Sequence, residues 1–424
     1  MKVLKLVSPI FVQPLTRLIN LSIQSGCFPT KWKMAHVYKM VFVDFRKAFD
    51  VVDHQLLLTK LRLYRVSDRS LSWFESYLSG RQHFVSVDSQ RSDSLLIKQG
   101  VPQGSVLGPA LFLLFVNDIP LHLTNSTVDI YADDTTITAS AHFSDLCSMT
   151  QRLYSNLDAV QRWASCNKMF INKKKTKSPL VHGKRIPAKL DEDTPLCLDV
   201  KIGDSVIEQV SSHKILGVVI DSQMNYESHI DELCKKLSKR IGLLKHISPF
   251  LKQPQRETYY NGVIKPTLLY GSMIWDSCNV EHLQSILKLQ KRAARIILDA
   301  ERLTPSVVLF NNLNWLPFTK QSLIKRCALV YKRVHNYTTP MYLNSLLVRN
   351  SEIHNRATRH SNINLVCPKY KRETEGGHTF TIRTIKDWNC MNANIRNNGS
   401  LASFKHNVFK SFLAEQKAAM LLRL

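Results

Sequence analysis

Three carboxylates in two short segments are the residues of this sequence best suited to chemistry. Asp133 and Asp134 are adjacent in Tyr131–Asp134, and Asp44 ends the apolar run that begins at Met40. Adjacent carboxylates repel each other unless a cation lies between them. On neighbouring strands, Asp44 and Asp133 would hold two Mg²⁺ ions about 3.5–4 Å apart, the arrangement that stabilises both oxygens of a phosphoryl displacement. A solvated Asp-Asp turn is the alternative interpretation of the pair.

The segments around these acids predict the elements that position them. Residues 40–44 are typical of a buried strand, and residues 128–138 predict a hairpin with an acidic tip. Further strands are expected at 84–88 and at 212–221, the second with a glycine inside it, and helices at 14–26, 56–63, 107–116 and 153–163. Strands that alternate irregularly with helices predict an α+β fold and not a Rossmann sheet.

Composition limits the class of partner. The chain has 424 residues, 44% of them hydrophobic, and 58 Lys and Arg against 33 acids give a formal charge of +25. Such an excess favours a phosphate-rich partner and a folded chain over a disordered one. Residues 301–424 hold 19 Lys and Arg against 6 acids. The nine cysteines are scattered without zinc-binding spacing, which favours an intracellular protein, nuclear or cytoplasmic and not secreted, with reduced thiols and no membrane partner.

Five blocks of sequence resemble, in their order, the reverse transcriptases of non-LTR retrotransposons of the jockey and chicken-repeat type, a LINE-type family. The blocks are Phe42–His54, Gln99–Pro109 with Asn117–Ile119, Tyr131–Asp134, Asn172–Thr176 and His213–Gly217. A single Tyr-x-Asp-Asp is weak evidence, whereas five ordered blocks are strong evidence. The resemblance implies a polymerase palm, an antiparallel sheet with helices on one face, followed by a helical thumb and a basic, mainly helical C-terminal region.

The activity that the resemblance implies is RNA-directed DNA synthesis. A primer 3′-hydroxyl would attack the α-phosphate of a dNTP with the help of two Mg²⁺ ions, or of Mn²⁺ in their place. Asp44, Asp133 and Asp134 would be the catalytic and metal-binding residues. An RNA template, a DNA primer or target, and dNTP would be the partners.

The same resemblance implies residues that contact the nucleotide. Phe45 to Phe49 would run beneath it, with backbone amides at the triphosphate and Phe49 against the sugar, where the ring leaves no room for a 2′-hydroxyl. Gln103 would lie along nucleotide and template, and Gly104 would let the backbone approach closely. An ordinary core phenylalanine and a Pro-Gln-Gly turn are the alternatives for Phe49 and Gln103.

Two further positions carry an implied role. Lys175 would face the triphosphate as a proton donor to pyrophosphate, or would be one lysine of a solvated face. Gly217 would lie near the primer end, or would mark a β-bulge. Trp315 and Trp388 are expected to be core aromatics and not base-stacking platforms.

The resemblance also suggests a domain organisation. We expect a remnant of the approach to the fingers at 1–39, the palm at 40–221, the thumb at 222–300 and the basic region at 301–424. The family's fingers blocks are not seen before Asp44. The first 40 residues leave no room for the endonuclease that many such elements carry, so we expect another chain to cut the target. The alternative to a polymerase is a truncated, inactive remnant that binds RNA or DNA only.

Overall fold

The computed structural model describes residues 36–124, 126–142, 145–183, 198–337, 339, 341–353, 363–369 and 379–421. The helix expected at 14–26 and most of the segment 1–39 lie outside these residues. The described chain divides into two compact units, which we call the N-terminal unit (residues 34–213) and the C-terminal unit (residues 214–424). Each unit is described by itself.

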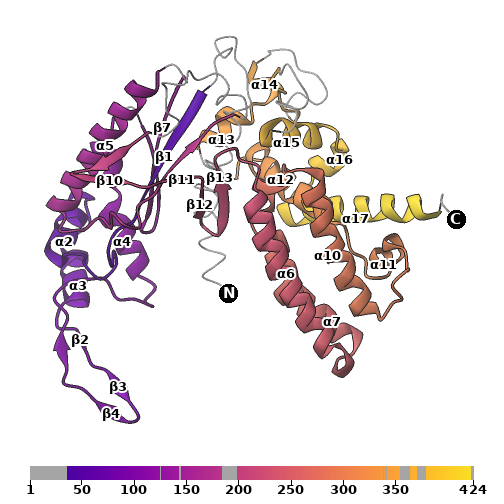
Figure 1. Ribbon diagram of the computed structural model, residues 1–424, viewed down its shortest axis with the longest axis horizontal. Coiled ribbons are helices and arrows are strands. Elements are labelled where there is room, and N and C mark those ends of the chain that lie inside the picture. Colours follow the sequence, from indigo (N-terminus) through magenta and orange to yellow (C-terminus); the bar gives the residue numbers. More distant parts are fainter. Residues whose placement is uncertain are drawn as a thin grey trace. The chain divides into compact units, whose positions relative to one another are not determined.

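The N-terminal unit is built on a sheet that contains β1 and β7 (Figure 1). The sheet has five strands in the order β11-β8-β1-β7-β6. The elements of the unit are β1 (His36–Val43), α2 (His54–Leu63), α3 (Asp68–Leu78), β2 (Gln82–His83), β3 (Ser86–Val87), β4 (Gln90–Arg91), β5 (Leu95–Leu96), α4 (Gly108–Val116), β6 (Thr127–Tyr131), β7 (Asp134–His142), α5 (Leu146–Cys166), β8 (Ser178–Val181), β9 (Val200–Ile202), β10 (Ser205–Ile207) and β11 (Gln209–Val210). Neighbouring strands of the sheet pair antiparallel, except that β8 and β11 are parallel.

The core of the N-terminal unit lies between the sheet and the helices α2, α4 and α5. Alternate side chains of β1 point to this face, as the two-residue period of a strand requires. Val41 of β1 and Ile137 of β7 are fully buried there, and Leu57, Phe112 and Leu157 supply the helical side of the same core. This arrangement confirms the predicted α+β fold with an antiparallel-rich sheet, and it fixes the strand ends that carry the acids.

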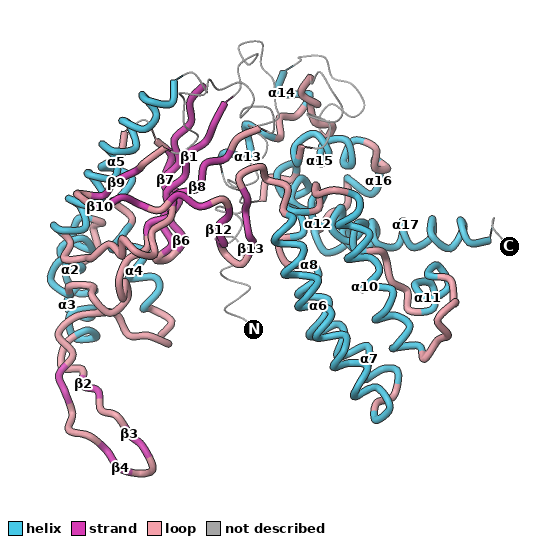
Figure 2. Tube along the Cα trace, viewed as in Figure 1, coloured by secondary structure: helices cyan, strands magenta, loops and turns pink. Residues whose placement is uncertain are grey.

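The strand expected at 84–88 is replaced by a two-stranded ribbon that is paired only in short stretches. β2 pairs with β5, and β3 with β4, each over two residues (Figure 2). Val85 and Leu95 are 63% and 62% exposed. Since no second face covers the ribbon in the described residues, the alternation of apolar residues at 84–88 does not lead to a regular half-buried strand.

The C-terminal unit is mainly helical, as expected. Its elements, with a hairpin that starts at the boundary, are β12 (Ser212–Ile215), β13 (Val218–Asp221), α6 (Glu227–Ile247), α7 (Gln253–Tyr259), α8 (Lys265–Leu269), α9 (Ser272–Trp275), α10 (Val280–Leu298), α11 (Ser306–Asn312), α12 (Phe318–Val334), α13 (Met341–Leu346), α14 (Asn350–Ile353), α15 (Phe380–Asn389), α16 (Ala393–Arg396) and α17 (Leu401–Leu421). A π-helical turn, Tyr260–Ile264, joins α7 to α8, where Pro266 has no amide hydrogen to continue the regular pattern.

The single strand predicted at 212–221 is wrong, because this segment forms the two-stranded hairpin β12–β13. Leu216 and Gly217 make its two-residue turn, and both have positive φ, +45° and +82°. Two positive φ values are what a tight hairpin turn with the right-handed twist of its strands requires. Gly217 is therefore a turn residue and neither a strand residue nor a bulge.

One hydrophobic core of the C-terminal unit runs from Val218 of β13 to Phe380 of α15. It includes residues of the expected thumb, such as Leu237, and of the expected basic region, such as Phe318. Trp315 and Trp388 are both buried, which confirms that they are core aromatics.

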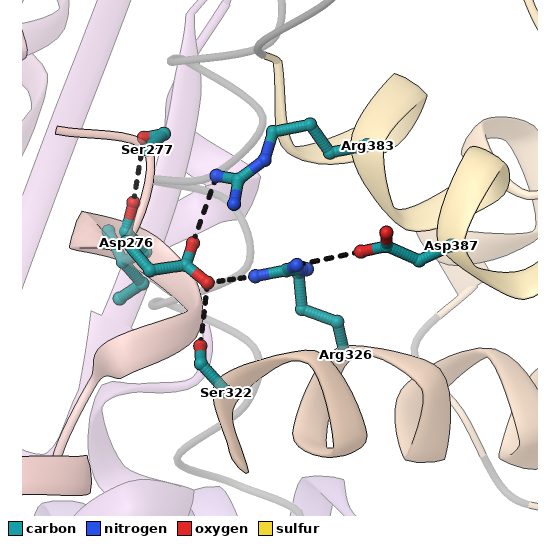
Figure 3. A network of polar contacts seen from close by, with 7 residues as sticks. Asp276, Ser277, Ser322, Arg326, Arg383 and Asp387 are labelled. Carbon is teal, nitrogen blue, oxygen red and sulfur yellow. Dashed lines mark hydrogen bonds and ion pairs between the residues drawn. The ribbon is translucent and has the colours of Figure 1, made fainter. Parts of the chain in front are cut away.

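A buried polar network ties three helices of this unit together (Figure 3). Asp276, which follows α9, accepts hydrogen bonds from Ser322 and Arg326 of α12, the first at 2.7 Å, and pairs at 3.2 Å with Arg383 of α15. Arg326 also pairs with Asp387 of α15 at 2.7 Å. Because Asp276 and Arg326 are almost fully removed from solvent, each depends on the other for its charge to be tolerated.

Candidate active site

The three predicted carboxylates lie at one end of the sheet in the N-terminal unit. The antiparallel register of β1 and β7 pairs Val43 with Thr135. Asp44 and Asp134 are the next residues along the two strands, so they lie at the same end. Tyr131 and Asp134 form the last pair of the β6–β7 hairpin. Asp133 lies between them, in the two-residue turn. The predicted hairpin with an acidic tip is confirmed.

The turn at this tip has an unusual backbone. Ala132 has a φ of +51°, in the left-handed region that residues with a Cβ rarely adopt. Such a conformation costs of the order of 1–3 kcal/mol and persists only where the surrounding structure holds it. Here the pairing of β6 with β7 holds both ends of the turn in place. Asp133 therefore lies at the end of the sheet.

Electrostatic coupling shows that the three acids are neighbours. The pKa of Asp134 is raised, first because the carboxyl is partly desolvated and then because Asp133 and Asp44 are negatively charged. Asp44 is half-buried, and Asp133 and Asp134 are exposed. A divalent cation would relieve this repulsion, and three carboxylates are the hard oxygen donors that Mg²⁺ prefers. The donor chemistry therefore fits a divalent metal, although the described side chains include no group of three or more acids, histidines or cysteines already arranged to hold one.

The loop of the second sequence block is tied to the turn that follows Asp44. The amide of Gly100 donates to the carbonyl of Val52 at 2.7 Å, and the amide of Val101 donates to that of Phe49 at 2.8 Å. The side-chain amide of Gln103 donates to Asp50 at 2.7 Å. Two segments about fifty residues apart in sequence are thus held together by backbone and side-chain bonds near the acids.

Two glycines of this loop have positive φ but differ in their surroundings. Gly100 has a φ of +90°, and a Cβ there would lie 2.7 Å from the carbonyl oxygen of Asp50. Gly104 has a φ of +79°, but a Cβ there would meet no atom within 4 Å. The first glycine allows close packing of two backbones, whereas the second leaves open space beside Gln103, which is itself exposed.

The two phenylalanines of the first block differ in their surroundings. Phe45 is 4% exposed and packs edge-on against Trp163. Its ring belongs to the core, so only its backbone is free to face a ligand. Phe49 is half-buried and stacks on Phe112 with ring centroids 4.3 Å apart. The structure thus combines core packing with partial exposure at Phe49.

The lysine-rich segment lies beside the end of β1. The amide of Asn172 donates to the carbonyl of Asp44 at 2.7 Å, and the amide of Asp44 donates to Thr176 Oγ1 at 3.3 Å. Lys168 pairs with Asp53 at 2.5 Å. The ammonium group of Lys175 is exposed and forms no ion pair or hydrogen bond with the described residues. Lys175 is therefore a free cation on a segment bonded to Asp44.

Gly217 belongs to the β12–β13 hairpin and not to the sheet that carries the acids. A Cβ at this position would lie 3.2 Å from the Tyr270 ring, and the Tyr270 hydroxyl donates to the carbonyl of Leu216. Gly217 thus permits Tyr270 to pack on the turn. The packing gives a structural reason for a glycine here.

A groove of about 420 Å³ adjoins this turn in the C-terminal unit. Its lining includes Lys214, Lys236, Arg240 and Glu232. Glu232 forms an ion pair with Lys214 at 2.9 Å. His229, also in the lining, is neutral at physiological pH because burial lowers its pKa to about 4. The charged side chains of the groove are therefore basic in excess.

Sequence reasoning missed the partner of Gln103 and the packing role of Gly100. Asp50 lies in the first block and Gln103 in the second, and nothing local in either segment signals that they bond. The packing role of Gly100 did have a local signal, because a glycine directly before Val-Pro-Gln-Gly indicates a position where another segment packs too closely for a side chain.

The chain belongs to the reverse transcriptase (RNA-dependent DNA polymerase) family, whose profile matches residues 2–220. It is similar to the RNA-directed DNA polymerase from mobile element jockey of Drosophila melanogaster, with 30% identity over 275 residues, 61% of this chain and 28% of that protein. It is also similar to the probable RNA-directed DNA polymerase from transposon BS of the same organism, with 28% identity over 65% of this chain and 30% of that protein. The chain thus spans less than a third of the length of these relatives.

Among solved structures, apo telomerase from Candida tropicalis has a TM-score of 0.34 and 12% identity, covering 74% of this chain and 49% of that one. Among the described residues, no helix combines the length and apolarity needed to cross a bilayer.

Proposed function

We propose that the N-terminal unit carries the polymerising site of an RNA-directed DNA polymerase of the non-LTR retrotransposon type. The observation that carries the proposal is the β1–β7 register, which puts Asp44 at the same end of the sheet as Asp133 and Asp134. The raised pKa of Asp134 supports it, because the negative charges of the other two acids contribute to it. Membership of the reverse transcriptase family is consistent with this chemistry.

Asp44, Asp133 and Asp134 would hold divalent cations, Mg²⁺ or in its place Mn²⁺. When bound, such ions supply charge neutralisation at the attacking and leaving oxygens of phosphoryl transfer. The role of the chain is to keep three negative charges together at a cost in repulsion, so that the site attracts divalent cations. The fixed hairpin and the bonded end of β1 serve this role, because they limit how far the acids can move apart.

The nucleotide would lie between the turn after Asp44 and the loop at Gln103. The bond from Gln103 to Asp50 orients the glutamine side chain, and the open space at Gly104 admits a base or sugar. Phe49, held against Phe112, would present its ring edge to the sugar and disfavour a 2′-hydroxyl. Lys175 would face the triphosphate and donate a proton to the leaving pyrophosphate.

An RNA template, a DNA primer and dNTP would be the partners of this site. Gly217 and the basic groove beside it would contact the primer strand, and the helices of the C-terminal unit would hold the duplex through phosphate contacts, which carry little sequence information. Every cysteine in the described ranges is free, which agrees with a reaction inside the cell, in nucleus or cytoplasm.

Primer extension on an RNA template tests this proposal. The full chain is supplied with primer, dNTP and Mg²⁺, and the product is compared with that of Asp133→Asn and of a control, Asp158→Asn. Asp158 is an exposed acid on α5 and, among the described residues, pairs only with Arg162, so its variant carries the same change at an acid outside the three candidate ligands. We expect Mg²⁺-dependent product from the wild type and the control, and none from Asp133→Asn.

The same assay separates a polymerase from a remnant that only binds nucleic acid. Absence of product from a folded wild-type chain that retains salt-sensitive RNA binding refutes the polymerase proposal for this chain. Equal product from wild type and Asp133→Asn refutes the assignment of the site.

A further inference from the structure

A cavity of about 270 Å³ lies in the N-terminal unit beside the last turns of α5. Four parts of the chain line it: α5, the segment 169–173, strand β9 and the turn after β1. Its described lining contains none of the three acids, and neither Gln103 nor Lys175. The cavity is therefore distinct from the proposed polymerising site.

Two cations line this cavity, Arg46 and Lys173, and its described lining contains no carboxylate. Within the described ranges, the Arg46 guanidinium forms no hydrogen bond or ion pair. The Lys173 ammonium donates one hydrogen bond, of 3.4 Å, to Ser205 Oγ. Because a guanidinium has five N–H donors and an ammonium has three, most of these donors remain available. A phosphate is the kind of ligand that such groups bind.

The β9–β10 hairpin holds the Lys173 ammonium beside a side-chain amide. Gly203 lies in the hairpin turn with a φ of +57°, and a Cβ there would lie 3.4 Å from Lys173 Nζ and 3.5 Å from the amide of Gln161. The ammonium and the amide therefore both lie against this turn, and both residues line the cavity. Since an amide can donate and accept hydrogen bonds, Gln161 is suited to contact the edge of a base.

The rest of the lining is mainly apolar and includes an exposed ring. Met169 and Ile202 are buried, whereas Phe170 is 62% exposed. A base can stack on an exposed aromatic ring of this kind. The volume of about 270 Å³ lies just below the range of roughly 300–1,000 Å³ that is usual for small-molecule sites. The size of the cavity therefore favours a single small molecule over a nucleic-acid strand.

We propose that this cavity binds a free nucleoside polyphosphate, with its phosphates at Arg46 and Lys173 and its base against Phe170. A phosphate without a base would leave the ring and the apolar lining unused. An apolar ligand would leave the two cations without a counter-charge. The inference goes beyond the proposed activity, since a nucleotide bound here is not consumed and needs none of the three acids.

The wall of the cavity is bonded to the strand end that carries Asp44. The amide of Arg46 donates to the carbonyl of Phe170 at 2.8 Å, and the amide of Asn172 donates to the carbonyl of Asp44 at 2.7 Å. A ligand that contacts both segments stabilises the state in which they are joined. Occupancy of the cavity should therefore slow hydrogen exchange in residues 44–46 and 169–173.

Isothermal titration calorimetry tests the proposal with the full chain and ATP, without primer, template or divalent cation. The double variant Arg46→Gln, Lys173→Gln removes both charges, and we expect its affinity for ATP to fall about tenfold or more, because two charge-assisted contacts are lost. Phe170→Ala should lower the affinity for ATP about fivefold or more. The same variant should leave the affinity for inorganic tripolyphosphate unchanged, since tripolyphosphate has no base.

The matched control is Lys47→Gln, Lys174→Gln, which makes the same charge change one residue further along each segment. Both lysines are exposed and lie outside the lining of the cavity. The control should lose much less affinity than the double variant, because exposed charges without direct contact to the ligand are screened. At an ATP concentration that saturates only the wild type and the control, hydrogen exchange in residues 169–173 should slow in these two proteins and not in the double variant.

The proposal is overturned if the double variant and the control lose affinity for ATP equally. It is also overturned if tripolyphosphate binds the wild type as tightly as ATP does, since the cavity would then select anions without regard to a base. Slower exchange at residues 99–104 and not at 169–173 would place the ATP in the polymerising site and would overturn it too. Asp133→Asn should bind ATP as the wild type does, so failure of the polymerase proposal leaves this test unaffected.

Discussion

Removing the buried carboxylate at the centre of the polar network should destabilise the C-terminal unit strongly. Asp276→Asn keeps the size of the side chain but removes the charge that Arg326 and Arg383 share (Figure 3). Arg326 is only 4% exposed at its side chain, so its charge would remain buried with Asp387 as its one acidic partner among the described residues. Breaking a buried ion pair by removing one partner costs about 3–5 kcal/mol.

Hydrogen exchange resolves this effect, because it reports the stability of individual helices in a chain with two units. For amides of α12 and α15, a loss of about 3–5 kcal/mol speeds exchange by roughly two to three and a half powers of ten. Helix α5 belongs to the N-terminal unit, and its exchange should stay unchanged.

Glu232→Gln is the control for this prediction, since Glu232 belongs to the same unit and pairs with Lys214, but the two side chains are 45% and 48% exposed. Loss of such a pair costs about 0.2–1 kcal/mol. If Asp276→Asn and Glu232→Gln speed exchange in α12 equally, the reasoning that the buried network holds these helices together is refuted.

Three further outcomes follow from the same geometry. At pH values above 6, Asp134→Asn should raise the thermal midpoint of the N-terminal unit, because it removes the repulsion that raises the Asp134 pKa. The same change should reduce primer extension, because the three negative charges also attract the cations. A lowered midpoint would contradict this. Gly100→Ala should cost about 2 kcal/mol or more, since its Cβ meets the Asp50 carbonyl, whereas Gly80→Ala, with positive φ but open space, should cost about 1 kcal/mol, both measured by urea unfolding. Because the pKa of Lys325 is about 8 in the folded chain, the unfolded chain binds more protons above that pH, and Lys325 should add up to about 3 kcal/mol to the free energy of unfolding between pH 8 and 10.5. Lys325→Met should reduce the rise without abolishing it, since the pKa values of Lys265 and Lys405 are also lowered; an unchanged rise would contradict this.

The strands and the hairpin that carry the acids were predictable from local sequence. An apolar run ending in Asp44 and two β-rich runs meeting at Asp133 are signals within about ten residues, and the structure confirms both elements. The convergence of Asp44 with the hairpin depends on the register of β1 and β7, which periodicity does not specify between distant strands. The blocks resembling a family supplied that expectation, and the roles of the individual residues stay predictions.

Other features had no local signal. A two-residue hairpin turn is usually marked by Asn-Gly or Asp-Gly, whereas the Leu216-Gly217 turn places a leucine at positive φ. The local sequence therefore predicts one strand here. The bond from Gln103 to Asp50 and the network at Asp276 join residues far apart in the chain. Such contacts arise from tertiary packing and cannot be derived from the spacing of residue types.

The network at Asp276 has a consequence for anyone who divides the chain into fragments. A piece ending near residue 300 keeps Asp276 but loses both guanidinium groups that neutralise it, together with Phe310, Phe318 and Phe380 of the shared core. Expressed in that form, the segment exposes hydrophobic core residues to solvent and leaves the carboxylate of Asp276 without a cationic partner. Deletion experiments at the C-terminus would then report misfolding of α6 and α10, and the loss would be mistaken for evidence of a direct contact made by the deleted part.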